Sequence, residues 1–146
     1  MFHAYNVYYF IEKFDRDEIL KLDKNIDIIF RNYKNNIDEN LIKKIKIFCK
    51  RNNRKFYLAN NVKIAVKLNL DGVYIPSFNK SLSIKYLSNK KIEIFGSAHN
   101  LNEIKIKEKQ GVNTIFLSPV FKIIKKNYHL GPIKFNLLSK LTSKKL

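Results

Sequence analysis

Short apolar runs alternate along the chain with segments whose apolar residues are spaced as on one face of a helix. The runs are rich in β-branched and aromatic residues, which favours buried strands. We expect about six strands, at Val7–Ile11, Ile26–Phe30, Lys55–Ala59, Asp71–Ile75, Ile92–Phe95 and Val112–Leu117. Helices are expected between them, at Asp15–Leu22, from the capping-box pair Asn36 and Glu39 past Phe48, at Val62–Leu68, at Ser81–Leu87 and from Asn100 to Gln110. This alternation is typical of a parallel α/β fold.

One of these helices has the sequence pattern of a strand. Glu103–Lys107 alternates charged and apolar residues with a period of two. Because it lies between two buried strands, and parallel strands need a crossover, we interpret it as a helix. Asn100 and Glu103 have capping-box spacing at its start, and Gly111 suits a left-handed backbone at its end.

Small and polar residues follow the fifth expected strand. The segment 96–100 reads Gly-Ser-Ala-His-Asn, which suits a loop that faces a ligand. Parallel α/β proteins place their sites at the carboxyl ends of the strands, so we expect a functional site here. We expect His99 to orient this loop and keep catalysis by its ring as the alternative.

The composition indicates one globular domain over residues 1–146. Apolar residues make up 45% of the chain and aromatic residues 13%, which is far from the composition of a disordered segment. No apolar run approaches the ~20 residues of a membrane span, and the amino-terminal residues do not resemble a signal peptide. The single cysteine, Cys49, is expected in the core, and we expect a cytoplasmic protein.

A formal net charge of +17 raises the question of a nucleic-acid partner. The lysines are scattered over every expected element instead of gathering on one face or tail, which disfavours that interpretation. The same charge would attract an anionic small-molecule substrate at long range. We therefore expect an anionic ligand and keep nucleic acid as the weaker alternative.

Three segments carry a family resemblance. They are Ser97-Ala98-His99, Ser118-Pro119-Val120-Phe121 and Leu130-Gly131-Pro132-Ile133-Lys134-Phe135. Together they resemble the thiamine phosphate synthase/TenI family, whose usual form is a Ser-x-His loop followed by a Gly/Ser-Pro-Val/Ile-Phe/Tyr strand end. The resemblance extends weakly back to about Tyr8.

The resemblance implies a TIM-barrel-like fold that is incomplete here. By this comparison Phe135–Lys140 is the sixth helix, and the last two strands are lacking, together with the Gly-Gly loop that binds thiazole phosphate in relatives. Whether the sequence is a natural short form or a fragment is left open. An open parallel sheet has unpaired edges, so we expect the chain to self-associate.

The resemblance also implies a reaction and a set of site residues. The synthase joins hydroxymethylpyrimidine diphosphate to thiazole phosphate, releases pyrophosphate and uses Mg²⁺. The positions that match substrate-binding residues of the family are Arg31, Asn60, Ser97 and Lys126. A guanidinium suits phosphate because it can donate two bonds at once. The family's lysine after the arginine is Tyr33 here, with Lys34 one residue further.

Several family positions are changed in this sequence. The two metal-binding aspartates of the family correspond to Asn61 and Asn79, and neutral amides bind Mg²⁺ less well than carboxylates. Ile123 and Lys125 stand where the family has threonines, and Pro119 replaces the catalytic histidine of the tautomerase branch. Each matching residue also has a structural alternative, as a surface cation, a turn residue or a helix cap.

Three hypotheses follow from these observations. The first is a divergent enzyme of thiamine synthesis or salvage. The second is a non-catalytic relative that keeps an anion site, which the two asparagines favour. The third is a basic nucleic-acid-binding protein that uses its charge alone.

Overall fold

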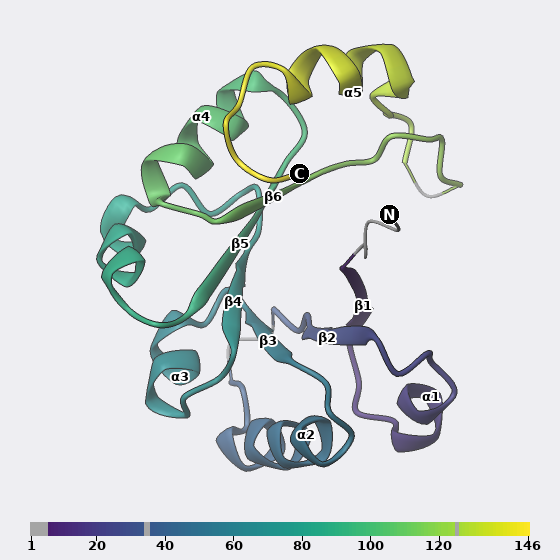
Figure 1. The fold of residues 1–146 in the computed structure, drawn as a ribbon, viewed down its shortest axis with the longest axis vertical. Coiled ribbons are helices and arrows are strands. Elements are labelled where there is room, and N and C mark those ends of the chain that lie inside the picture. The colour runs from purple at the N-terminus through teal and green to yellow at the C-terminus, as the bar shows by residue number, and fades with distance from the viewer. Residues whose placement is uncertain (1–5, 34–35, 125) are drawn as a thin grey trace, which may run out of the picture. The chain divides into compact units, whose positions relative to one another are not determined.

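A computed structural model describes residues 6–33, 36–124 and 126–146 and divides the chain into two compact units, 1–73 and 74–146. Lys34 and Lys125 lie outside the described residues. The first unit contains β1 (Val7–Ile11), α1 (Arg16–Leu20), β2 (Ile26–Phe30), α2 (Glu39–Arg51), β3 (Phe56–Ala59) and α3 (Val62–Lys67) (Figure 1). The unit boundary falls inside β4 (Gly72–Ile75). The second unit continues with the 3₁₀ helix η1 (Leu82–Asn89), β5 (Glu93–Ala98), α4 (Leu101–Gln110), β6 (Thr114–Leu117) and α5 (Gly131–Ser139).

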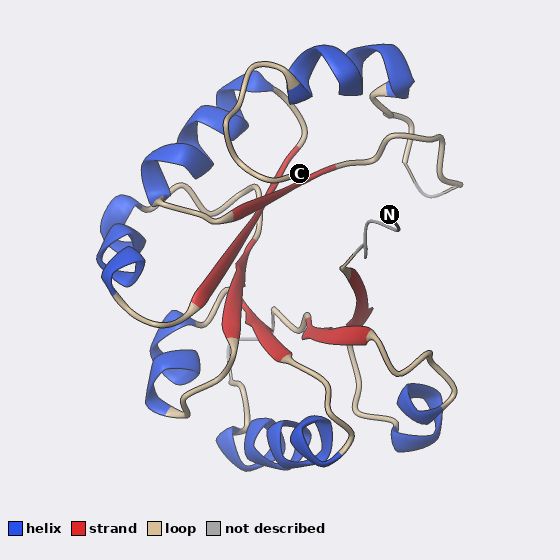
Figure 2. Ribbon diagram, in the orientation of Figure 1, coloured by secondary structure: helices blue, strands red, loops and turns tan. Residues whose placement is uncertain are grey.

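Strands and helices alternate along both units (Figure 2). In the first unit β1 pairs with β2 and β2 with β3, all in parallel. In the second unit β5 pairs in parallel with β6, with Ser97 opposite Phe116. Six strands alternating with helices form an incomplete TIM-barrel-like α/β fold, as the sequence predicted. None of the helices in the described ranges has the length and apolar composition needed to cross a bilayer.

Side chains cap the helices of the first unit, although one cap differs from the prediction. Asp15 accepts hydrogen bonds from the backbone N–H groups that begin α1. The helix α2 begins after Asp38, whose carboxylate accepts from Asn40 N at 2.8 Å, so the predicted start at Asn36 was wrong. A carboxylate next to the first turn also interacts well with the helix dipole, which an asparagine two residues earlier does not.

The strand–helix unit around residue 100 follows the prediction closely. Asn100 Oδ1 accepts from Glu103 N at 3.0 Å, and Gly111 ends α4 in the left-handed conformation with a φ of 78°. The segment Glu103–Lys107, whose charged and apolar residues alternate, is helical, as we predicted from its position between two strands. The Glu103 carboxylate accepts from His99 N at 2.8 Å, one residue before the cap. The strand β5 extends to Ala98, so the predicted loop from residue 96 was wrong over its first three residues.

Two other elements differ from the prediction. The segment expected as a helix at 81–87 is a 3₁₀ helix, and the last helix starts at Gly131, four residues before the expected Phe135. Pro132 allows the earlier start, because the first turn of a helix needs no N–H donor there. Beyond α5, the N–H of Ile115 in β6 donates to Lys145 O at 2.8 Å, so this strand edge is partly paired.

Apolar side chains pack between strands and helices within each unit. In the first unit Ile42, Ile45 and Cys49 of α2 are fully buried. This burial confirms Cys49 as a core residue, and it raises the pKa of the thiol to about 12, which disfavours a thiolate nucleophile. Arg54 is also buried, and its guanidinium donates to four backbone carbonyls, those of Ile19, Leu22, Asp23 and Ile26.

Candidate functional site

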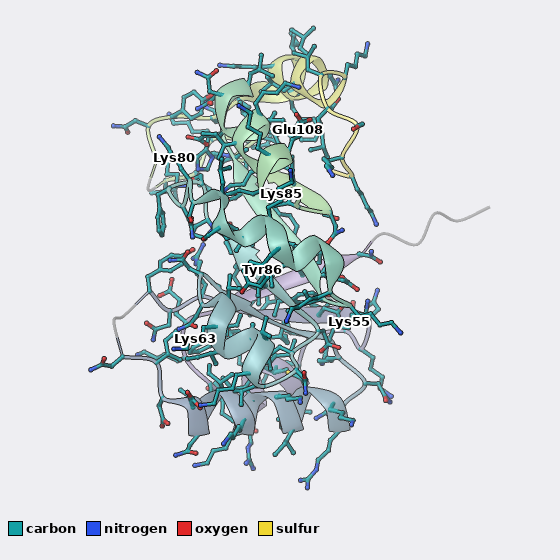
Figure 3. All side chains as sticks on the ribbon, turned by 90° about the vertical axis from the view of Figure 1, so that its left-hand side faces the viewer. Lys55, Lys63, Lys80, Lys85, Tyr86 and Glu108 are labelled. Atoms are coloured by element: carbon teal, nitrogen blue, oxygen red, sulfur yellow. The ribbon has the colours of Figure 1, made fainter. Side chains whose placement is uncertain are left out.

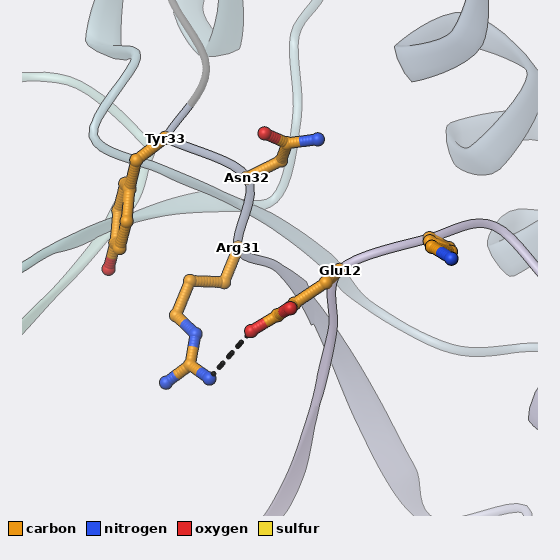
Figure 4. A pocket seen from close by; sticks show the side chains of 5 residues that line it. Glu12, Arg31, Asn32 and Tyr33 are labelled. Carbon is orange, nitrogen blue, oxygen red and sulfur yellow. Dashed lines mark hydrogen bonds and ion pairs between the residues drawn. The ribbon is translucent and has the colours of Figure 1, made fainter.

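In the first unit a small pocket lies at the carboxyl ends of β1 and β2. It has a volume of about 280 Å³ and is lined by Glu12, Lys13, Arg31, Asn32 and Tyr33 (Figure 4). Arg31 directly follows β2, and its backbone N–H donates to Ile11 O, which continues the strand pairing. The predicted position of Arg31 at a strand end is therefore confirmed, although its role in binding stays a prediction.

The Arg31 guanidinium contacts Phe10 and Glu12 and remains partly exposed to solvent. Its carbon lies 5.1 Å from the centroid of the Phe10 ring, and Nη2 donates to Glu12 Oε1 at 3.2 Å. The two side chains are 40% and 72% exposed, and such exposed pairs contribute little to stability, about 0–1 kcal/mol. Glu12 therefore restrains Arg31 weakly, and an anion could replace it.

Asn60 and Asn61 follow the neighbouring strand β3. Since β2 and β3 are parallel, Asn60 lies at the same sheet edge as Arg31. Asn60 has a φ of 57°, a left-handed backbone that asparagine tolerates better than most residues. Asn61 caps α3, and its Oδ1 accepts from Ile64 N at 3.0 Å. The helix-cap alternative therefore describes Asn61 correctly.

In the second unit Ser97 and three aromatic rings share one face of the sheet. A side chain at Gly96 would meet Lys107 of α4, so Gly96 faces the helix and its neighbour Ser97 faces the opposite side. Phe116 contacts Phe95 and Tyr74 at ring-centroid distances of 5.5 and 5.8 Å. Ser97 is buried on β5 instead of lying in an open loop.

His99 links the ends of three chain segments. Its Nε2 lies 3.2 Å from Ser77 Oγ after β4, and its Nδ1 contacts the carbonyl oxygen of Ser118 after β6. A carbonyl can only accept, so Nδ1 carries the proton in a neutral ring, and Nε2 accepts from the Ser77 hydroxyl. Tyr128 O–H donates to His99 O at 3.3 Å. These contacts orient the loop, as expected for His99.

The other predicted site residues of the second unit, Lys126 and Asn79, are not among the residues that contact the His99 ring. Lys126 is exposed in the β6–α5 loop, where its N–H donates to Ile123 O at 3.0 Å. Asn79 follows β4, and its Oδ1 accepts from Ser81 N at 3.0 Å, which shapes the turn before η1. Arg31, Asn60 and Asn61 belong to the first unit, whereas Asn79, Ser97 and Lys126 belong to the second.

The residues in the predicted metal positions are poor ligands for Mg²⁺. Both amide oxygens, of Asn61 and of Asn79, already accept a backbone N–H, and neither carries charge. Mg²⁺ favours carboxylate oxygens and near-ideal octahedral geometry. Among the residues that the structure describes, no group of three or more His, Cys, Asp or Glu side chains could hold a metal ion. The donor set does not fit Mg²⁺.

Some residues at these strand ends were not predicted from the sequence. Glu12 was missed because its partner Arg31 is 19 residues away, and Ser77 because only folding brings it to His99. Lys107 was not singled out among the scattered lysines, yet it is fully buried. A signal was present, because Lys107 lies three residues from both Ile104 and Gln110 and so shares their helix face.

Comparisons with known proteins agree with this fold. The sequence model of the thiamine monophosphate synthase family matches residues 22–145. Over 82 residues the chain is 30% identical to "Putative thiamine-phosphate synthase 2" of Aquifex aeolicus (strain VF5), an alignment that covers 56% of this chain. It covers only 44% of that relative.

A solved structure supports the fold independently. The chain resembles the thiamine phosphate pyrophosphorylase from Pyrococcus furiosus with a TM-score of 0.64, over 95% of this chain and 72% of that one. At 15% sequence identity this similarity shows the fold alone. Because the family match spans most of the sequence, the chain belongs to the thiamine monophosphate synthase family.

Proposed function

We propose that this chain acts in thiamine synthesis or salvage by binding hydroxymethylpyrimidine diphosphate, and that it joins this substrate to thiazole phosphate with release of pyrophosphate. The Arg31 pocket carries the proposal. It places a half-exposed guanidinium at the carboxyl end of β2, where parallel α/β proteins bind their ligands. The net charge of +17 would draw such an anion toward the protein.

The second unit has an aromatic face of its own. Tyr74, Phe95 and Phe116 form a run of ring contacts beside Ser97. Tyr74 and Phe95 are buried, so only the partly exposed Phe116 ring could contact a planar pyrimidine there. We assign phosphate binding in the first unit to Arg31 and Asn60, and propose Ser97 and Lys126 of the second unit as substrate-binding residues in their own right.

The proposed chemistry requires a departing pyrophosphate to be stabilised. The bond between the pyrimidine methylene and the diphosphate oxygen breaks, the oxygen keeps the electron pair, and the thiazole nitrogen bonds to the methylene. Arg31 would donate to the oxygens that gain charge. Mg²⁺ would supply further charge compensation, but Asn61 and Asn79 do not fit it, so we assign it no step.

We expect the protein in the cytoplasm.

Calorimetric titration with pyrophosphate tests the binding site. Replacing Arg31 by alanine should weaken binding by about 1.5–3 kcal/mol, the usual contribution of a hydrogen bond to a charged group. Arg51→Ala is the matched control, because it removes an exposed arginine of the same unit outside the pocket. Equal losses in both variants would show diffuse charge attraction instead of a site.

A non-catalytic relative that keeps the anion site is the second candidate. The observation that favours it is the pair of neutral amides at Asn61 and Asn79. Asn61→Asp combined with Asn79→Asp should create a Mg²⁺ dependence of pyrophosphate binding that the natural chain lacks. Titrations with and without Mg²⁺, on both proteins, measure it. A natural chain whose binding already depends strongly on Mg²⁺ would contradict our assignment of the metal positions.

A further inference from the structure

Lys107 places a charged group inside the second unit. Its side chain is fully buried in α4, and Nζ donates to Pro76 O at 2.8 Å, to Asn79 O at 2.8 Å and to Gln110 Oε1 at 2.9 Å. An ammonium has three N–H donors, so every donor has an acceptor. Buried charges are costly unless they are fully hydrogen-bonded, which indicates a specific role for this lysine.

Gln110 completes the same network from the next turn of α4. It is also fully buried, and its Nε2 donates to Asn79 O and to Ser81 O, both at 2.9 Å. Its Oε1 accepts from Lys107, so all its polar atoms are used. Together the two side chains hold three backbone carbonyls of the segment 76–81.

The sheet leaves room for this arrangement at one position. A Cβ atom at Gly96 of β5 would lie 2.8 Å from Lys107 Cδ and 3.1 Å from Val112 Cγ1. Glycine therefore lets the lysine stem pass between α4 and β5. Burial lowers the pKa of Lys107 to about 8, while nearby Glu103 opposes this shift, so the side chain is mainly protonated at neutral pH.

The segment that this network holds carries a residue of the candidate site. Ser77 lies between Pro76 and Asn79, whose carbonyls bind Lys107, and its hydroxyl contacts His99 Nε2 at 3.2 Å. We propose that Lys107 and Gln110 are positioning residues, a buried clamp on segment 76–81 that keeps Ser77 against His99 and so fixes the orientation of that ring. The clamp's relevance to ligand binding rests on the function proposed above, but its effect on His99 does not.

Nuclear magnetic resonance of the full chain tests the clamp directly. In the natural protein, ring ¹⁵N shifts should show His99 protonated at Nδ1, with the signal assigned by its loss in His99→Asn. Lys107→Met keeps most of the stem but removes the donors. It should loosen the contact with Ser77 and so shift the Nε2 signal of His99, and amide exchange in 77–81 should be roughly 10-fold or more faster, as expected for loss of about one hydrogen bond.

Lys109→Met is the matched control, since it makes the same change at an exposed position of α4 and should alter neither signal. Should Lys107→Met fail to fold, Gln110→Met tests the same clamp, because it removes three of the network's five hydrogen bonds, two to the segment and one from Lys107. A folded Lys107→Met or Gln110→Met protein with unchanged amide exchange and an unchanged His99 Nε2 signal would overturn the proposal.

Binding measurements separate the clamp from the proposed function. Pyrophosphate binding is assigned to Arg31 in the first unit, so Lys107→Met and Lys109→Met should both leave it unchanged if the proposed function holds. If natural protein fails to bind pyrophosphate while Lys107→Met still changes the His99 signals, the clamp stands and the proposed function fails. Neither result depends on turnover by the enzyme.

Discussion

At the scale of residues, Glu12 lies beside Arg31 in the proposed anion site. The carboxylate lies 3.2 Å from the guanidinium and lines the same pocket. A bound phosphate would have to replace this contact and would lie close to a second negative charge. The site is therefore expected to bind less tightly than an unpaired arginine would.

Glu12→Gln should tighten pyrophosphate binding. The change removes the repelling charge and keeps the side-chain size, and for an exposed pair we expect a gain of up to about 1 kcal/mol, or roughly 5-fold in affinity. Calorimetry at low and high salt measures it, and the gain should shrink at high salt. Glu39→Gln, at an exposed ion pair on α2, is the control. Unchanged affinity in Glu12→Gln would mean that the anion does not bind beside Arg31.

The charge of Lys107 should make stability depend on pH in a distinctive window. The pKa is about 8 in the folded protein and ordinarily 10.5, so below pH 8 the lysine is charged in both states and burial costs about 3 kcal/mol. Between these values the unfolded chain binds more protons, so this contribution makes stability rise with pH, and above 10.5 the cost is gone.

Urea unfolding of the natural protein and of Lys107→Met measures this contribution. The difference in free energy of unfolding between them should change by about 3 kcal/mol from pH 7.5 to pH 10.5, in favour of the natural protein at high pH. The same comparison with Lys109→Met should show little change, because that lysine is exposed. A flat difference for Lys107→Met would show that the lysine is better hydrated than its burial implies.

At the scale of elements, α4 is the helix whose ends matter most for the site. Its cap, Asn100, follows His99 directly, and the Glu103 carboxylate bonds to the His99 N–H. The first turn of the helix thus holds the end of β5, while the clamp near its last turn holds the segment after β4. One helix therefore positions two of the strand ends at which the second unit could bind ligand.

Asn100→Ala should destabilise the protein by about 1 kcal/mol, the usual cost of losing an N-cap. The helix would lose the bond from Glu103 N to Asn100 Oδ1. Asn102 is exposed and lies two residues after Asn100, in the first turn of α4. Asn102→Ala should cost much less stability and is the control for replacing an asparagine by alanine. Thermal unfolding of both variants measures the effect, and equal costs would indicate that the cap is not formed in solution.

At the scale of the molecule, charge and exposed apolar surface act against each other. The lysines labelled in Figure 3, Lys55, Lys63, Lys80 and Lys85, are all exposed and come from both units. In the second unit Phe121, Ile124, Ile133 and Leu137 are at least 60% exposed. Apolar side chains exposed to this extent favour association, whereas a net charge of +17 opposes it.

We therefore expect self-association that increases with salt. Salt shortens the range of charge repulsion, to about 10 Å at 0.1 M, and leaves apolar contacts in place. Ile133→Lys combined with Leu137→Lys should reduce association measured by light scattering, whereas Leu20→Lys, at an exposed position of the first unit, should reduce it less. A monomer at every salt concentration would contradict this prediction.

The elements were predictable to within a few residues because their signals are local. Apolar runs defined β1 and β2 at their observed bounds, and Asn100 and Gly111 defined the ends of α4. The errors were also local: Asp38 caps α2 instead of Asn36, and β5 runs on through Ser97 because Gly and Ser there face packed layers instead of solvent. Which residue caps a helix, and at which residue a strand ends, depends on the packing of neighbouring segments, which local sequence patterns do not show.

The sequence by itself determined the family, the alternation of strands and helices, and the position of Arg31 at a strand end, because each depends on motifs and periodicity along the chain. Only the tertiary structure showed that Glu12 faces Arg31, that Ser77 meets His99, and that Lys107 is buried. These contacts join residues 19, 22 and 28–31 positions apart. The physical reason is that the spacing of residues along the helix tells which face Lys107 lies on, whereas the carbonyl groups that surround its side chain come from distant segments and are brought there only by folding.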